Sequence, residues 1–179
     1  MSKRVFTFLL FISVILLSCE KTTDKIFDFG SSTFSATVYS QNKKGIEFSI
    51  AKVPNEYFLN HHKIQNNDSL GFEDVFIYEL LADDSSDLMK TKSNLDFDKV
   101  VQHMSQQIYE DFLAVNENGD EIPCVGITHE RTFQVRPQER LILYFKRQSD
   151  SPIIQIIYTD RLYDVGQVIH TLKEKNIKL

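Results

Sequence analysis

The stretch Gly45–Tyr57, with the sequence GIEFSIAKVPNEY, decides the fold class. Its first apolar residues alternate with Glu47 and Ser49, and a period of two is that of a strand with one buried face. Pro54 ends this strand, because proline cannot donate a hydrogen bond to a central ladder. The same alternation precedes it at Phe34–Val38, so the domain opens with a hairpin of two antiparallel strands.

The rest of the chain extends this pattern toward the carboxyl end. Asn118–Gly119 is a strong hairpin signal between two of the later strands. Leu141–Phe145 is apolar on both faces, which indicates a central strand covered on both sides and paired next with Ile153–Tyr158 in a meander. The further strands are expected at residues 72–81, up to residue 115, and at residues 122–135, 141–145 and 153–158.

Two segments have helical instead of strand periodicity. Apolar residues at helical spacing predict an amphipathic helix over Phe97–Ile108, after a capping-box-like pair, Ser93 and Asp96. A second amphipathic helix is predicted over Val165–Leu172, with Asp164 as its cap. Together the elements predict an α+β fold, an antiparallel sheet of about seven strands with two amphipathic helices packed on it.

The element order and the Gly45–Tyr57 stretch resemble those of the Mog1/PsbP-like α/β/α sandwiches, in which early strands precede a helix, a meander and a terminal helix. The resemblance is topological and covers residues 33–175. It implies a fold and no particular activity.

The amino-terminal residues have the organisation of an export signal. Lys3 and Arg4 precede a mostly apolar run, Val5–Leu17, which would span only about 20 Å as a helix, against about 30 Å for the core of a bilayer. Such a short segment indicates a cleaved signal peptide, with an uncleaved anchor as the alternative.

The end of this run, Leu16-Leu17-Ser18-Cys19, resembles the lipobox of bacterial lipoproteins. The resemblance implies diacylglycerol in thioether linkage on Cys19, cleavage before it and acylation of the new amino group. It divides the chain into a lipoprotein signal peptide (1–18), a lipidated cysteine with a polar tether (19–32) and a single α+β domain (33–179). Glu20 after the cysteine favours the outer membrane, with the domain in the periplasm or at the cell surface.

Composition limits the classes of partner. Residues 1–18 include two basic residues and no acidic ones, so the mature chain has 18 basic and 25 acidic residues and a charge of −7. This balance argues against nucleic acid as a partner and leaves the lipid on Cys19 to hold the protein on the membrane. Cys124 is then the one remaining thiol, so an intramolecular disulfide is excluded and a buried position is expected.

The predicted strand over residues 122–135 contains the candidate site. Strict alternation places His129 and Arg131 on the apolar side with Val125 and Ile127, where they could line a pocket or bind an anion. Two structural alternatives exist. A bulge could turn them outward, or carboxylates such as Asp111 or Asp160 could satisfy them inside the core.

Other candidate ligand groups are weaker. His61-His62 is a solvated pair, because adjacent side chains rarely share one ion. The acidic segments Asp83–Asp87 and Asn116–Glu121 do not have the spacing of a twelve-residue calcium loop. The sequence has no nucleophile elbow, zinc-protease motif or phosphate-binding glycine loop, so we expect no metal, cofactor or catalytic residue.

These observations predict an envelope lipoprotein, anchored in the membrane through Cys19, whose acidic domain is a non-enzymatic module that binds an envelope protein or supports an assembly. The alternative is a small-ligand-binding or enzymatic domain with a pocket near His129 and Arg131. A passive structural lipoprotein is a third interpretation.

Overall fold

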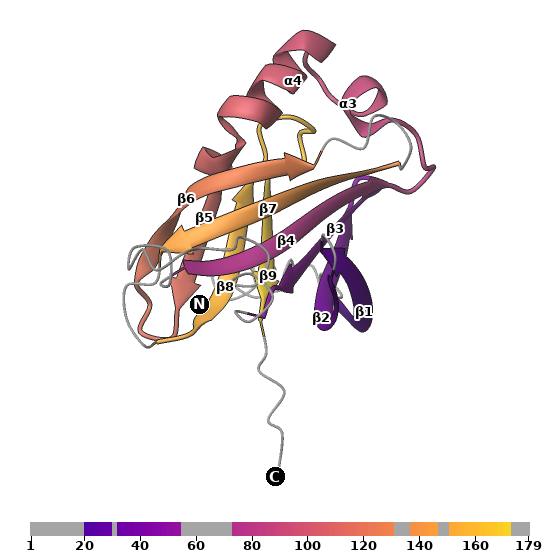
Figure 1. Ribbon diagram of the computed structural model, residues 1–179. Coiled ribbons are helices and arrows are strands. Elements are labelled where there is room, and N and C mark those ends of the chain that lie inside the picture. Colours follow the sequence, from indigo (N-terminus) through magenta and orange to yellow (C-terminus); the bar gives the residue numbers. More distant parts are fainter. Residues whose placement is uncertain (1–19, 30–31, 55–72, 131–136, 147–150, 173–179) are drawn as a thin grey trace, which may run out of the picture.

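The computed structural model describes residues 20–29, 32–54, 73–130, 137–146 and 151–172. These residues form one antiparallel sheet of nine strands, in the order β1-β2-β3-β4-β7-β6-β5-β8-β9, with two helices, α3 and α4, and the short 3₁₀ helix η1 (Figure 1). The α+β class is confirmed, and the sheet has two strands more than the seven expected.

The elements are β1 (Lys21–Phe29), β2 (Ser32–Lys43), β3 (Ile46–Lys52), β4 (Glu73–Ala82), α3 (Leu88–Thr91), α4 (Phe97–Gln106), η1 (Ile108–Asp111), β5 (Phe112–Asn116), β6 (Glu121–Glu130), β7 (Gln138–Lys146), β8 (Ile153–Thr159) and β9 (Gln167–Thr171).

The strands predicted from alternation form where expected. β2 and β3 are joined by Lys44 and Gly45, both with positive φ (51° and 77°), the backbone that a two-residue hairpin turn of the favoured hand requires. Gly119 likewise has a φ of 85° in the turn between β5 and β6. β7 lies between β4 and β6 and is buried on both faces, which confirms the central strand predicted at Leu141–Phe145.

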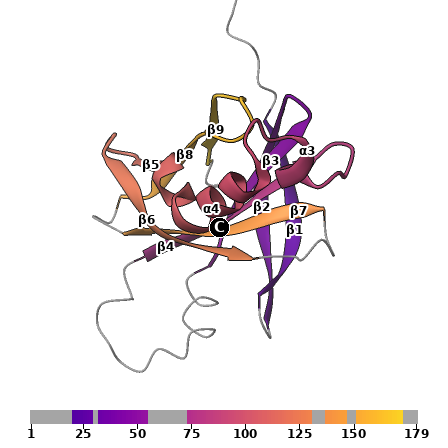
Figure 2. The same cartoon turned by 90° about the horizontal axis from the view of Figure 1, so that it is seen from above.

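The sheet separates two apolar clusters. On the side covered by α4, alternate residues of the central strands pack with Val100 and Met104 of the helix (Figures 1 and 2). This larger cluster contains an aromatic group in which Tyr78 lies 4.9 Å from Phe112 and 5.6 Å from Tyr158 between ring centroids. The smaller cluster lies on the opposite side and comprises Phe27, Phe34, Val38, Ala51, Val53, Val75, Ile77 and Ile142.

The sequence predicted a tether at residues 19–32. This prediction is wrong for the residues that the structure describes there. Residues 21–29 form strand β1, which pairs with β2 along its whole length, Lys21 opposite Ser40 and Phe29 opposite Ser32. The strand escaped prediction because most of its side chains are exposed and Phe27 alone is classed as buried among those described. Phe27 stacks on Phe34 at 5.6 Å, and this contact binds the strand to the smaller cluster.

A buried ionic network also holds β1 on the sheet. The Glu79 carboxylate, 6% exposed, accepts from the Arg140 guanidinium at 2.7 and 2.8 Å and from the Lys25 ammonium at 2.6 Å. Both cations lie over the ring of Phe27, with Lys25 Nζ 5.2 Å and Arg140 Cζ 5.9 Å from its centroid. The central strands β4 and β7 are therefore linked through side chains to the first strand of the sheet.

The predicted helix over Val165–Leu172 is also wrong, because residues 167–171 form strand β9, paired with β8. Val168 and His170 point into the core while Ile169 is 45% exposed, so the true period is two. Asp164 is not a helix cap but a turn residue with a φ of 56°. The predicted terminal helix was one of several features behind the resemblance to the Mog1/PsbP-like sandwiches, and residues 167–171 form a strand instead.

Two smaller expectations need correction. Asp96 is the N-cap of α4, and Ser93 lies outside it, accepting a hydrogen bond from the Leu95 amide and donating one to the Leu162 carbonyl. Strand β8 pairs with β5 and β9 and not with β7, so the expected meander is interrupted. Among the described residues, no helix has the length and apolar character needed to cross a bilayer.

Candidate functional site

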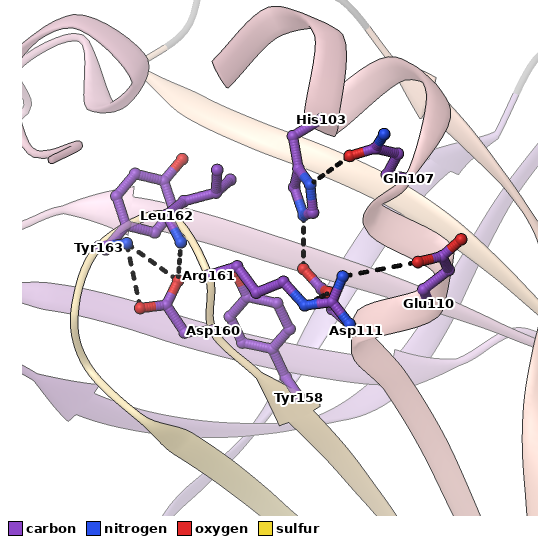
Figure 3. Close-up of polar contacts among 9 residues, drawn as sticks. All are labelled: His103, Gln107, Glu110, Asp111, Tyr158, Asp160, Arg161, Leu162 and Tyr163. Carbon is purple, nitrogen blue, oxygen red and sulfur yellow. Dashed lines mark hydrogen bonds and ion pairs between the residues drawn. The ribbon is translucent and has the colours of Figure 1, made fainter. Parts of the chain in front are cut away.

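A group of titratable side chains lies where α4, η1 and the β8–β9 loop meet (Figure 3). The ring of His103 contacts two side chains, with Nε2 2.6 Å from Asp111 Oδ2 and Nδ1 3.3 Å from Gln107 Oε1. The Arg161 guanidinium lies 3.0 Å from the other oxygen of Asp111 and 3.5 Å from Glu110.

Local sequence explains how these groups meet. His103 is on the buried side of α4 with Val100 and Met104, at a spacing that follows from the helical period. Gln107 is four residues further on, where it faces the same ring. Burial raises the pKa of the fully covered Asp111 carboxyl, and its hydrogen bond with His103 opposes that rise.

The arrangement has part of the geometry of a general base. A carboxylate that orients a histidine is common to many catalytic sites, where the second ring nitrogen faces a nucleophile or substrate. Here the second nitrogen of His103 faces the amide oxygen of Gln107. The observed contacts therefore join α4, η1 and the loop to one another, which is a structural role.

A second carboxylate organises the adjacent loop. Asp160 accepts hydrogen bonds from the amides of Leu162, Tyr163 and Val165 at 2.8 to 3.0 Å. It also accepts from the hydroxyl of buried Tyr158 at 3.0 Å. This single side chain fixes the loop that brings Arg161 to Asp111.

The structure answers the question left open for His129. Its Nε2 lies 2.7 Å from the Glu139 carboxylate, so a carboxylate does satisfy it, but the partner is Glu139 and not Asp111 or Asp160. Arg131 lies outside the described residues. The proximity of His129 and Arg131 is therefore not tested, and the pocket stays a prediction.

A bulge is present, but before His129. The register shifts between Cys124 and Gly126, which leaves Val125 outside the ladder and 52% exposed. Ile127 and His129 share one face of β6, as expected. Strict alternation would place Cys124 on the other face, but because of the bulge it lies on the same face as His129. The expected burial of the Cys124 thiol is confirmed, and burial raises the pKa of this thiol.

His170 is a buried titratable group that sequence reasoning missed. Its ring is fully covered, lies edge-on to Tyr78 at 5.6 Å, and has no hydrogen-bond partner among the described residues. The Glu20 carboxylate is 3.8 Å from its Nδ1. Assigning a strand here would have placed His170 inward with Val168, but the helical interpretation concealed that alternation.

We expect His170 to make the fold sensitive to acid. Burial, with a smaller contribution from the charge of Lys43, lowers the pKa of His170 from 6.5 to about 4. The neutral ring thus favours the folded state fully above pH 6.5, and this contribution is lost as the pH falls through about 4. At about 1.4 kcal/mol per pKa unit, the loss is about 3 kcal/mol.

Urea unfolding at a series of pH values measures this effect, with His170→Phe as the control that keeps an aromatic ring and removes the titration. The difference between the two proteins should grow in favour of the variant as the pH falls. Parallel stability curves would contradict the assignment.

The remaining candidates are structural or lie outside the described residues. His61 and His62 are among those outside. In the acidic loop before α3, Asp84 accepts from Lys92 and from the Ser86 amide, and Asp87 caps α3. The described ranges contain no group of three His, Cys, Asp or Glu side chains able to hold a metal ion.

Comparison with known proteins gives no match: no family model fits the chain, and no curated protein or solved structure is similar to it.

Proposed function

We propose that the protein is a lipid-anchored lipoprotein of the bacterial cell envelope whose domain is a non-enzymatic interaction or assembly module. The observation that supports this best is the Leu16-Leu17-Ser18-Cys19 sequence together with the fold that begins beside it. Strand β1 starts at Lys21, and the Glu20 carboxylate accepts a hydrogen bond from the Thr171 amide at 3.2 Å. A cleavage before Cys19 would leave the whole described fold intact.

The contacts of the polar side chains favour a module over an enzyme. His103 and Asp111 contact each other and further side chains of the same network. Asp160 is occupied by backbone amides and by Tyr158. Groups that stabilise neighbouring elements in this way have a structural role, because buried polar groups are usually hydrogen-bonded to other parts of the protein.

One observation supports a small-ligand site as the second candidate. The Nδ1 atom of His129 is buried and has no hydrogen-bond partner among the described residues, although its Nε2 faces Glu139. A ligand that forms one hydrogen bond with Nδ1 would give both ring nitrogens of His129 a partner. His129→Ala takes the partner from the buried Glu139 carboxylate and should cost stability in either case, so a ligand site is recognised by binding that is lost at a temperature where the variant is still folded.

We expect Cys19→Ala to abolish membrane anchoring. Without the thiol, no diacylglyceryl group can be attached, and each acyl methylene removed from the bilayer costs about 0.8 kcal/mol of membrane affinity. The cell should accumulate an unprocessed precursor of higher mass that does not incorporate labelled palmitate. Ser18→Ala is the matched control, because a small residue before the cysteine is retained. A palmitate-labelled band that persists in Cys19→Ala would contradict the proposal.

The module itself is tested by crosslinking the tagged lipoprotein in cells and identifying the captured proteins by mass spectrometry. One stoichiometric envelope partner, lost with Cys19→Ala, is the expected result. A monomer without a partner would favour the small-ligand alternative.

A further inference from the structure

The lipid site and the start of the fold are almost contiguous, and this restricts how the domain can sit on a membrane. Lys21 is the second residue after Cys19, so the chain between them reaches at most about 7 Å. Lys21 pairs with Ser40, three residues before β2 ends at Lys43. The chain therefore leaves β1 toward the β2–β3 turn and not toward the opposite end of the strands.

Three segments meet at this end of the sheet, and we call them the turn end: the β2–β3 turn (44–45), the β8–β9 loop (160–166) and the α3–α4 junction (92–96). Lys44 bonds the Asp164 carboxylate at 2.8 Å. The Leu162 carbonyl accepts from the amide of Asn94 and the hydroxyl of Ser93, both at 3.1 Å. These contacts place the β8–β9 loop between the turn and the junction.

The turn end exposes apolar side chains. Leu95 and Phe97, at the junction and at the first position of α4, are 42% and 43% exposed. The Lys90 ammonium lies 5.4 Å from the centroid of the Phe97 ring. An exposed aromatic ring and a leucine beside a lysine match the chemistry of a lipid–water interface, where the ring enters the acyl boundary and the ammonium reaches the headgroups.

We propose that the turn end faces the bilayer and that Leu95 and Phe97 insert into its interface. The inference depends on the proposed lipid anchor on Cys19. Once the acyl chains are in the membrane, contact between this end and the lipid is an intramolecular event at high effective concentration. A protein partner at Leu95 and Phe97 would have to enter between the domain and its own anchor, which is why we assign the surface to lipid.

The chain contains no tryptophan, so a single substitution introduces a specific optical probe. The experiment uses the full lipidated protein in phosphatidylethanolamine–phosphatidylglycerol vesicles, with Phe97→Trp as the probe. Val125→Trp is the matched control, because Val125 is 52% exposed and lies beside Phe145, near the end of β7 that is remote from the turn end. Brominated acyl chains quench tryptophan that enters the lipid, and mass spectrometry of the same samples establishes whether Cys19 is acylated.

We expect Phe97→Trp emission to shift to shorter wavelength and to lose intensity with brominated lipid, while Val125→Trp emission stays unchanged. Acylated protein with unquenched Phe97→Trp emission, or with equal quenching of both variants, would overturn the orientation and leave the anchor intact. If the protein does not bind the vesicles and its Cys19 is unmodified, the proposed anchor is wrong, and so is the orientation.

Discussion

Glu79→Ala is expected to lower the free energy of unfolding by about 3 to 5 kcal/mol, because it removes one partner from a buried charge network. The change leaves the Arg140 guanidinium, 10% exposed, with Glu130 at 3.3 Å as its one remaining carboxylate in the described network. It also releases the ammonium of Lys25 from the sheet. Urea denaturation measures the loss, and amide hydrogen exchange should show faster exchange along β1.

Two variants distinguish the cost of leaving a buried charge without its partner from the cost of losing an ordinary surface ion pair. Glu110→Ala breaks the half-exposed pair with Arg161 and should cost no more than about 1 kcal/mol. The double variant Glu79→Leu, Arg140→Leu replaces the pair with apolar groups and should recover much of the loss. A cost for Glu79→Ala as small as that of Glu110→Ala would show that the network does not hold β1 on the sheet.

Asp160→Ala is expected to cost roughly 3 to 5 kcal/mol, since several donors lose their acceptor at once. Leu162 and Tyr163 are buried, so their amides cannot turn to water without moving the loop. The hydroxyl of Tyr158, itself fully covered, is also left unpaired.

The melting temperature and urea midpoint measure this loss, with Asp160→Asn as the conservative comparison. Asparagine keeps one oxygen acceptor and should retain part of the stability. If Asp160→Ala unfolds like the unaltered protein, the loop is held by other contacts and the assignment of Asp160 as its organiser is wrong.

Elements with strong local patterns were predictable from the sequence. The alternation in β3 is visible because its apolar residues pack on the larger cluster while Glu47 is exposed. The apolar run of β7 is visible because its two faces pack against the two clusters. The helical spacing from Phe97 predicts α4 to within two residues at its end. The class of fold follows from these elements alone.

The two edge strands were not predictable from local pattern. In β1, side chains such as Lys25 are stabilised by residues more than fifty positions away, and no local period records that. In and beside β9, the apolar residues Val165, Val168, Ile169 and Leu172 match helical spacing by chance. Pairing with β8 instead decides the backbone, and tertiary contacts outweigh local preference.

In the candidate site, too, local pattern predicts some positions while contacts between distant residues decide the others. Helical spacing could place His103 on the buried stripe, but its contact with Asp111 depends on the turn of η1, and the contact of Asp111 with Arg161 depends on a loop fifty residues later. The bulge at Val125 changed the side that Cys124 faces, and the signal that could have marked it is Gly126, an isolated glycine inside the strand pattern. Register irregularities of this kind set which side chains meet.

The central claim is that the fold begins immediately after a lipid-bearing Cys19. Mass spectrometry of the amino-terminal peptide of the protein extracted from membranes tests this most directly. We expect a peptide that starts at Cys19, carries a diacylglyceryl group and an acylated amine, and continues with Glu20 and Lys21. A peptide that starts at Met1, or an unmodified Cys19, would contradict it.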